Sequence, residues 1–391
     1  MVSFSRMPVD SLSLRVNRLP RAALGSPELS IVDMYCGAGG LSLGSLYAAV
    51  GLGYKPRFAL AADRDTEALG VYCRNLRPER TSTEDAGMVV DYQLDQLDSR
   101  PIFAYPPTLL PGALADIPNI DLFLAGPPCQ GHSNLNNHTR RDDPRNQSYL
   151  ATAATAIAAG ARAVVIENVR EAIAAKGDPV GTSVRLFEDA GYHVQLVVLD
   201  ASEYGVAQTR KRGFLIATKS QAESVANVAA TMRRPVASAL SVIDDLLDVD
   251  SQNPFDRPST PGQETQARIN YLFDNDLYEL PDSQRPDCHK AGNTYKSVYG
   301  RIQPSSPSGT ITQGFLTMGR GRFVHPTRRR CLTPHEAARI QCFPDAYQFV
   351  GTSGEVLSHR ALSKLIGNAV PPRLGELACR VALSSLNLSN G

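Results

Sequence analysis

The chain has 391 residues, of which 42% are hydrophobic and 20% are charged, and its formal net charge is +1. This is the composition of an ordinary globular protein, with enough length for two or three domains. Seven cysteines without a Cys-x-x-Cys pair argue against a disulfide framework and a metal site, and no apolar run is long enough to cross a membrane. Because the first twenty residues lack the apolar core of a signal peptide, we expect a cytoplasmic protein.

The first predicted elements are a buried strand over residues 29–35, a glycine-rich turn over 36–40 and a helix over 41–50. Such a turn lets a ligand approach the backbone at a helix N-terminus. A second strand over 57–62 ends at Asp63. An acid at that place can accept hydrogen bonds from both hydroxyl groups of a ribose, so the pattern predicts a nucleoside ligand.

Two further positions refine this ligand. Ser42 stands where a dinucleotide-binding turn needs its third glycine, which favours a nucleoside without a pyrophosphate and disfavours a nicotinamide oxidoreductase. A third element near residues 83–86 offers Asp85 as an acid for the adenine edge, and Asp91 competes for the same role.

The sequence Gly-Pro-Pro-Cys-Gln at 126–130 follows an apolar run over 120–125. Two prolines remove two backbone donors, so the chain must leave the sheet and hold Cys129 rigidly at the end of a strand. A free cysteine is usually a small buried hydrophobe, but this context indicates a nucleophile. The basic, polar stretch over 131–147 then suits a lid that closes over a polyanion.

Strands and helices continue to alternate in the next part of the chain. We expect helices over 149–161 and 184–190, and strands over 163–166, 193–199 and 213–217. This alternation predicts an α/β fold with a doubly wound, mostly parallel sheet. The ends of its strands would bring Gly37, Asp63, Cys129 and Glu167 to one edge.

The pattern changes from about residue 219 to 354, where Pro, Ser, Gly and Asn clusters predict a second, smaller, irregular β-rich domain. A helix is expected over 333–339, and a final helix is expected to start within 365–372 and run to 386. Charge is divided within this part. Ten acids against two arginines give residues 242–284 a net charge of −8, whereas residues 285–339 carry +8, which suits a surface that contacts phosphates.

Six blocks stand in a recognisable order: the glycine turn, Gly-Pro-Pro-Cys-Gln, Glu-Asn-Val at 167–169, Gln-x-Arg-x-Arg at 208–212, Arg-Cys-Leu-Thr at 330–333 with Glu-Ala-Ala-Arg at 336–339, and Gly-Asn at 367–368. Together they span residues 33–372 and resemble the DNA cytosine-5 methyltransferases that use S-adenosyl-L-methionine. The resemblance implies a Rossmann-like catalytic domain over 1–218, a target-recognition domain over 219–354 and a returning segment over 355–391.

The resemblance also implies roles for single residues. Cys129 would add to carbon 6 of cytosine, Glu167 would serve ring nitrogen 3, Arg212 would hold the ring carbonyl oxygen, and Arg210 would lie beside the thiolate. The cofactor would be held by Tyr35, Cys36, Gly37, Ala38, Gly39, Gly40, Asp63, Asp85, Pro128 and Asn368. DNA would be held by Gln130, Ser133, Arg140, Arg141, Thr310, Arg320, Arg322, Arg328 and Arg329. His132 departs from the aromatic or other apolar residue that the family usually places in the catalytic loop.

We therefore expect a DNA (cytosine-5-)-methyltransferase (EC 2.1.1.37) that acts as a monomer on duplex DNA in a bacterial cytoplasm or nucleoid. It would flip its target base out of the duplex and would serve a restriction-modification system, with a cognate restriction endonuclease as its genetic partner. A tRNA cytosine-5 methyltransferase would share the catalytic blocks, but the long recognition segment favours DNA. A catalytically silent DNA-binding protein is disfavoured because Cys129, Glu167 and Arg212 are all present.

Overall fold

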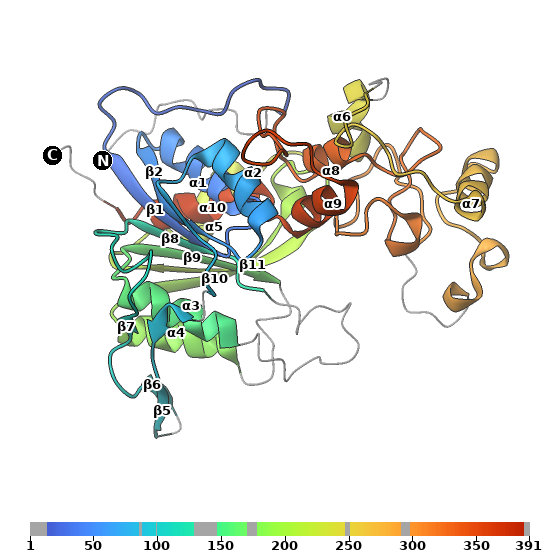
Figure 1. Cartoon of the computed structure of the whole chain (residues 1–391). Helices are drawn as coiled ribbons and strands as arrows, with labels where there is room; N and C mark the ends of the chain where they lie inside the picture. The colour runs from blue at the N-terminus through green and yellow to red at the C-terminus, as the bar shows by residue number, and fades with distance from the viewer. Residues whose placement is uncertain are drawn as a thin grey trace.

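The computed structural model describes residues 14–85, 88–98, 100–128, 147–169, 178–246, 251–290 and 298–386. Its centre is a seven-stranded sheet in the order β10-β11-β9-β8-β1-β2-β3 (Figure 1). The strands are β1 (Glu28–Met34), β2 (Lys55–Ala62), β3 (Arg80–Ser82), β8 (Leu122–Ala125), β9 (Ala163–Val169), β10 (His193–Asp200) and β11 (Lys211–Thr218). Only β11 runs antiparallel to its neighbours in this sheet, which confirms the mostly parallel, Rossmann-like fold.

Helices cover both faces of the sheet, as its continuous apolar strands require. All four residues of β8 are buried, which is typical of a parallel strand with helices on each side. On one face lie α1 (Gly40–Gly51), α5 (Val225–Met232) and α10 (Pro372–Leu383), and on the other lie α3 (Gln147–Ala158) and α4 (Pro179–Asp189) (Figure 1). Helix α2 (Thr66–Leu76) joins β2 to β3.

The order of the strands fixes where a ligand can bind. From β1 the chain passes through α1 to β2 and then to β3, before it crosses back to β8 on the other side of β1. The strand order therefore reverses between β1 and β8. In sheets of this kind ligands bind at such a point, outside the carboxyl ends of the strands.

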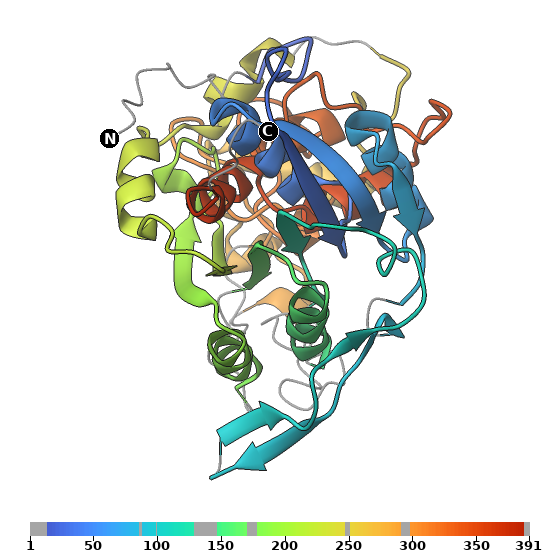
Figure 2. The same ribbon diagram turned by 90° about the vertical axis from the view of Figure 1, so that its left-hand side faces the viewer.

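An arm for which the sequence analysis predicts no element lies between β3 and β8. It holds two small antiparallel ladders, β4 (Val90–Asp91) with β7 (Thr108–Leu109) and β5 (Leu94–Leu97) with β6 (Arg100–Phe103). Figure 2 shows it in cyan, projecting away from the main sheet. These strands have two to four residues each, too few for a readable alternation of polar and apolar side chains.

The predicted final helix is confirmed, because α10 begins at Pro372 and ends at Leu383, but a helix that the sequence analysis did not predict precedes it. The chain forms α9 (His359–Asn368) and then α10, which begins at Pro372. Ala369 leaves the helical region with φ −59° and ψ 144°, and Pro371 and Pro372 cannot donate the backbone hydrogen bonds that would continue α9. Asn368 is therefore the last residue of one helix rather than part of the next.

The expectation of a β-rich domain over 219–354 is wrong for the described residues there. They form α5, α6 (Ala239–Ile243), α7 (Gln263–Asp274) and α8 (Pro334–Ile340), with isolated β-bridges in place of strands. Prolines and glycines are frequent in this part of the sequence, and proline cannot donate the hydrogen bonds of a ladder. A separate small hydrophobic cluster joins α7 to residues 280–331, whereas α5, α6 and α8 share the main core. The domain boundaries themselves stay predictions.

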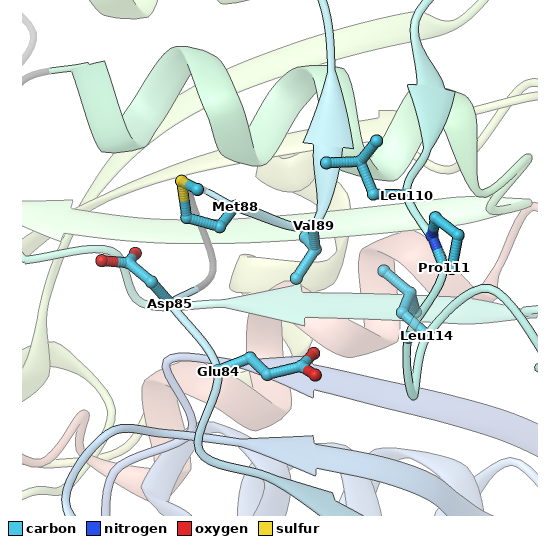
Figure 3. Close-up of a pocket in the computed structure, with 8 residues that line it drawn as sticks. Glu84, Asp85, Met88, Val89, Leu110, Pro111 and Leu114 are labelled. Carbon is cyan, nitrogen blue, oxygen red and sulfur yellow. The ribbon is translucent and has the colours of Figure 1, made fainter.

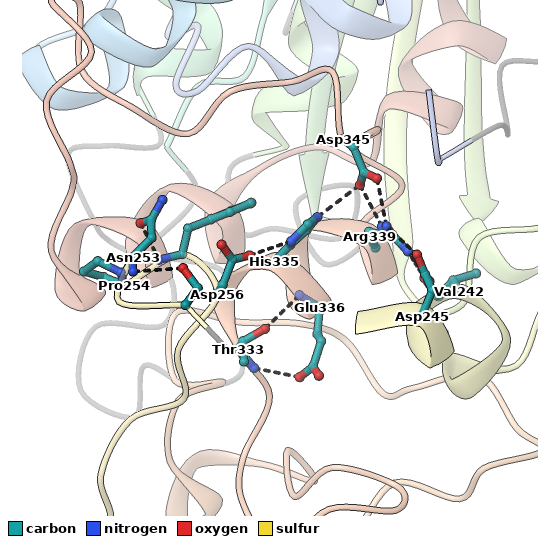
Figure 4. A network of polar contacts seen from close by, with 12 residues as sticks. Val242, Asp245, Asn253, Pro254, Asp256, Thr333, His335, Glu336, Arg339 and Asp345 are labelled. Carbon is teal, nitrogen blue, oxygen red and sulfur yellow. Dashed lines mark hydrogen bonds and ion pairs between the residues drawn. The ribbon is translucent and has the colours of Figure 1, made fainter. Parts of the chain in front are cut away.

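Helix α8 ties these regions together through buried charge (Figure 4). The Arg339 guanidinium is only 3% exposed and binds Asp245 at 2.6 Å and Asp345 at 2.7 Å. One turn away, the two ring nitrogens of His335 lie 2.8 Å from Asp256 and 3.0 Å from Asp345. Burial opposes protonation of this ring, but its hydrogen bonds with the two carboxylates outweigh burial and raise the pKa of His335.

Candidate active site

The carboxyl ends of β1, β8 and β9 meet at Gly126. A methyl group at Gly126 would lie 3.7 Å from the backbone oxygen of Tyr35 and 3.9 Å from Oε2 of Glu167. The backbone nitrogen of Gly126 also donates to the backbone oxygen of Met34 at 3.3 Å. Of the residues predicted to converge at one edge, Gly37, Asp63 and Glu167 lie at the ends of neighbouring strands there, whereas Cys129 lies outside the described residues.

The glycine turn divides into an open part and a packed part. Gly37 has φ +53°, a value that favours glycine, and no atom lies within 4 Å of where its Cβ would be. By contrast, a Cβ at Gly39 would lie 2.5 Å from the Tyr347 hydroxyl, and one at Gly40 would lie 2.2 Å from the Val370 backbone oxygen. Gly37 is thus free to face a ligand, whereas Gly39 and Gly40 let the helix pack against the C-terminal part of the chain.

The neighbours of these glycines are mostly buried. Cys36 is 6% exposed and Ala38 is 3% exposed, and the Ala38 backbone oxygen accepts a hydrogen bond from Tyr347 at 2.6 Å. Burial raises the pKa of the Cys36 thiol well above its usual value, so this cysteine is unreactive. Burial also raises the pKa of the Tyr35 phenol, and hydrogen bonds with Ser148 and Thr152 of α3 oppose that rise.

Asp63 follows β2 and is held by backbone groups on both carboxylate oxygens. Its Oδ2 accepts from the Gly37 nitrogen at 2.8 Å, and its Oδ1 accepts from the Asp65 nitrogen at 2.9 Å. Burial raises the pKa of Asp63, and these two hydrogen bonds work against the rise. Each carboxylate oxygen keeps a further acceptor position, so Asp63 is fixed beside the open Gly37 and can still bind a hydroxyl group.

A buried polar cluster behind the turn was missed by the sequence analysis. Asp33 is 1% exposed, accepts from the Ser42 hydroxyl at 2.6 Å, and Ser42 also lies 2.7 Å from the Tyr72 hydroxyl. Burial raises the pKa of Asp33 to about 7. The available signal was a carboxylate within an otherwise apolar strand. Ser42, which we had used to disfavour a dinucleotide, here has a second role as the partner of Asp33.

The two acids proposed for adenine each have a side-chain partner. Asp85 forms an ion pair with Arg64 at 3.1 Å, and Asp91 accepts a hydrogen bond from Tyr105 at 3.0 Å. Asp85 lies on the wall of a pocket whose other lining residues are Glu84, Met88, Val89, Leu110, Pro111, Gly112 and Leu114 (Figure 3). Its contact with the cofactor stays a prediction.

Glu167 and Arg212 form the central charged pair. Residue 167 lies opposite Phe214 in the β9–β11 ladder, so Arg212, two residues earlier, is on the same face. The Arg212 Nε lies 2.9 Å from Glu167 Oε1, and the two side chains are 16% and 12% exposed. Burial raises the pKa of Glu167, and the opposing charges of Arg212 and Arg210 lower it less.

Arg210 is held by backbone oxygens from two distant parts of the chain, and its place beside the Cys129 thiolate stays a prediction because Cys129 lies outside the described residues. It is 2% exposed, and its guanidinium donates to the backbone oxygens of Ile311 at 2.7 Å, Gly367 at 3.3 Å and Ala369 at 3.0 Å. These bonds connect the start of β11 to the end of α9. The exposed Asn368 side chain accepts from Gln313 at 2.7 Å in the same region.

Comparison with known proteins decides the family. A family model described as C-5 cytosine-specific DNA methylase matches residues 29–380. The chain belongs to this C-5 cytosine-specific DNA methylase family. It is a DNA (cytosine-5-)-methyltransferase, EC 2.1.1.37, as the sequence analysis predicted.

Individual relatives agree with this assignment. The chain is 39% identical to the Type II methyltransferase M1.BsuMI of Bacillus subtilis, over 94% of this chain and 83% of that protein. It is 27% identical to the Type II methylase M.HgiDII of Herpetosiphon aurantiacus, over 90% and 94% of the two chains. The solved structure of S. pombe Dnmt2 methyltransferase has the same fold, with a TM-score of 0.56 at 16% identity over 92% of this chain and all of that one.

The residues that the sequence assigns to DNA are only partly described in this methylase. The described Pro128 is exposed, and the residues that follow it in the predicted catalytic loop, Cys129, Gln130, His132, Ser133, Arg140 and Arg141, lie outside the described residues. Thr310 donates its hydroxyl to the Thr209 backbone oxygen at 2.9 Å. Arg322 binds the Tyr278 backbone oxygen and Glu279, and Arg329 binds Asp274 at 2.7 Å. Arg320 and Arg328 are exposed.

The part of the methylase that the structure describes contains neither a candidate metal site nor a membrane-spanning helix. No three His, Cys, Asp or Glu side chains come together there as a possible metal site. No helix within those ranges is both long enough and apolar enough to cross a membrane.

Proposed function

We propose that this methylase transfers a methyl group from S-adenosyl-L-methionine to carbon 5 of a cytosine flipped out of a specific duplex sequence, through a covalent bond to Cys129. The observation that carries the proposal is the Glu167–Arg212 pair at 2.9 Å, whose acid lies against Gly126, three residues before Cys129. A base cannot reach such an edge from within a duplex, so flipping is part of the proposal.

The residues at the ends of β1 and β2 fit the proposed cofactor. Gly37 leaves open space beside the backbone, and Asp63 is fixed next to it by two backbone hydrogen bonds. Asp63 would hold the ribose hydroxyls, Tyr35 and Gly37 would line the nucleoside, and Pro128 and Asn368 would border the reacting end. When bound, the cofactor supplies an electrophilic methyl group on a sulfonium.

The side chains then carry the chemistry of the base. The Cys129 thiolate forms a bond to carbon 6, and the displaced electrons collect on the ring as nitrogen 3 takes a proton or hydrogen bond from Glu167. Arg212 orients Glu167 and binds the ring carbonyl oxygen. Carbon 5 gains the methyl group and then loses its proton to a water molecule, and that electron pair restores the ring double bond as the sulfur–carbon 6 bond breaks and the thiolate leaves. Nitrogen 3 returns its proton to Glu167.

The relatives also support a biological setting. Both bacterial relatives named above are Type II enzymes, so we propose that this chain is the modification enzyme of a restriction-modification system. A monomer and a cognate endonuclease stay predictions. Methylation of a random-sequence duplex library, followed by base-resolution mapping of methylcytosine, tests the activity. One enriched sequence is expected. Preferential methylation of tRNA in a competition assay would contradict the proposal.

Replacement of Asp63 tests the cofactor site. Asp63→Ala should weaken S-adenosyl-L-methionine binding by about 1.5–3 kcal/mol, because a charge-assisted hydrogen bond is lost. Titration calorimetry measures the affinity, and thermal unfolding of the same sample reports any loss of the two backbone bonds. Asp116→Ala, an exposed acid near Arg80, is the control. Unchanged affinity would remove Asp63 from the site.

A further inference from the structure

The basic segment over 285–339 is largely neutralised by the acidic segment that precedes it. Arg322 binds Glu279, Arg329 binds Asp274, and Arg339 binds Asp245. Further pairs join Arg301 to Asp276 and, within the basic segment, Arg330 to Glu336. Most of the described cations in this segment are therefore already paired with carboxylates, and few of their side chains are available to bind DNA.

Arg320 differs from these arginines. Its side chain is exposed, and no described residue lies within hydrogen-bonding or ion-pair distance of its guanidinium. Its backbone is nevertheless firmly held. Met318, two residues before Arg320, is fully buried in the small hydrophobic cluster that contains α7. The Met318 backbone oxygen accepts a hydrogen bond from the Tyr299 backbone nitrogen at 2.8 Å.

Two glycines, Gly314 and Gly319, leave room for neighbouring side chains around Arg320. A Cβ at Gly314 would lie 2.5 Å from the Arg320 Cβ, and one at Gly319 would lie 3.0 Å from the Tyr299 hydroxyl. The stem thus packs closely over Gly314 while the guanidinium faces solvent. Because the aliphatic part of the Arg320 side chain is already packed, the guanidinium loses little conformational entropy when it binds a partner in one orientation.

The loop that packs under Arg320 also contacts the end of α9 and Arg210. Gly314 follows Gln313, whose amide donates to Asn368 at 2.7 Å and whose backbone nitrogen would be 2.3 Å from a Cβ on Gly367. The same loop begins at Ile311, which binds the Arg210 guanidinium at 2.7 Å. Arg320 is therefore linked to the strand that carries Arg212 by a few closely packed residues.

We propose that Arg320 is a specificity-determining residue that reads a guanine near the target cytosine in the major groove. A guanidinium donates two parallel hydrogen bonds to O6 and N7 of guanine, a pattern that no other base offers. A phosphate contact would carry no sequence information. The inference rests on the proposed function and adds to it the base that the recognition segment selects.

The test uses the full-length enzyme and its mapped target duplex. Each guanine is replaced in turn by 7-deazaguanine, which pairs normally but lacks N7, and kcat/KM is measured for the wild-type enzyme, Arg320→Ala and Arg320→Lys. At one position the wild type should lose about 10- to 100-fold, and Arg320→Ala should lose less than about threefold. Arg320→Lys should keep the salt dependence but lose most of the discrimination.

Arg257→Ala removes another exposed arginine of residues 219–354 and should behave like the wild type. Thermal unfolding checks that the variants are folded. An Arg320→Ala enzyme that shows the wild-type penalty at every guanine overturns the inference, and so does uniformly weaker binding with a salt slope reduced by about one, which indicates a phosphate contact. A wild-type enzyme that methylates no duplex overturns both this inference and the proposed function.

Discussion

Glu167→Gln is expected to lower kcat by about 10²- to 10⁴-fold, the range that a positioned general acid contributes. Glutamine keeps the size of the side chain and can still accept from Arg212, but it cannot transfer a proton to ring nitrogen 3. Burial raises the pKa of Glu167, so wild-type activity should fall as the pH rises through that pKa and the acid loses its proton. The variant should lose this pH dependence.

The measurement is single-turnover methyl transfer to the target duplex over a range of pH. Glu188→Gln, a change at an exposed acid on α4, is the control and should leave both the rate and the profile unchanged. A Glu167→Gln enzyme within tenfold of the wild-type rate would show that Glu167 is not the proton donor.

Arg210→Met is expected to lower the free energy of unfolding by about 3–5 kcal/mol. The change removes a 2% exposed guanidinium and leaves the backbone oxygens of Ile311, Gly367 and Ala369 without their donor. Urea denaturation measures the loss. The matched change Lys211→Met removes an exposed cation one residue away and should alter stability by less than about 0.5 kcal/mol.

This comparison distinguishes a structural role of Arg210, through the backbone oxygens that it binds, from its predicted role beside the Cys129 thiolate. If Arg210 acts only on the thiolate, the variant will unfold at the wild-type urea concentration and lose only activity. A loss of stability together with activity supports the contacts seen here, because the same guanidinium holds the loop and helix end that border the active edge.

The sequence predicted the catalytic sheet well because its signals are local. Apolar strands end in Asp63 and Glu167, and the alternation with helices requires those ends to share an edge. The sequence alone could not show that Gly37 faces open space whereas Gly39 and Gly40 are packed. The packing depends on Tyr347 and Val370, which lie about three hundred residues further along the chain.

Long-range pairing explains the other differences. The acidic and basic segments were read as separate surfaces, but their side chains neutralise one another, as Arg322 and Glu279 do. Likewise, Arg210 binds Ile311 and Ala369, at separations of 101 and 159 residues. No local sequence pattern indicates such partners, so the structural contacts of Arg210 could not be predicted from the motif in which it stands.

Covalent trapping on 5-fluorocytosine tests the central claim most directly. In a target duplex with this base at the reactive position, Cys129 can still add to carbon 6 and the methyl group can still be transferred. Fluorine then occupies the place from which carbon 5 must lose a proton, and it cannot leave as a cation, so the sulfur–carbon 6 bond persists.

We predict a protein–DNA adduct that survives denaturation, that requires S-adenosyl-L-methionine and that peptide mapping places on Cys129. Cys129→Ser should abolish the adduct, whereas single replacement of Cys36, Cys73, Cys288, Cys331, Cys342 or Cys379 should not. The absence of an adduct on a duplex already shown to be methylated at that cytosine would contradict the Cys129 mechanism.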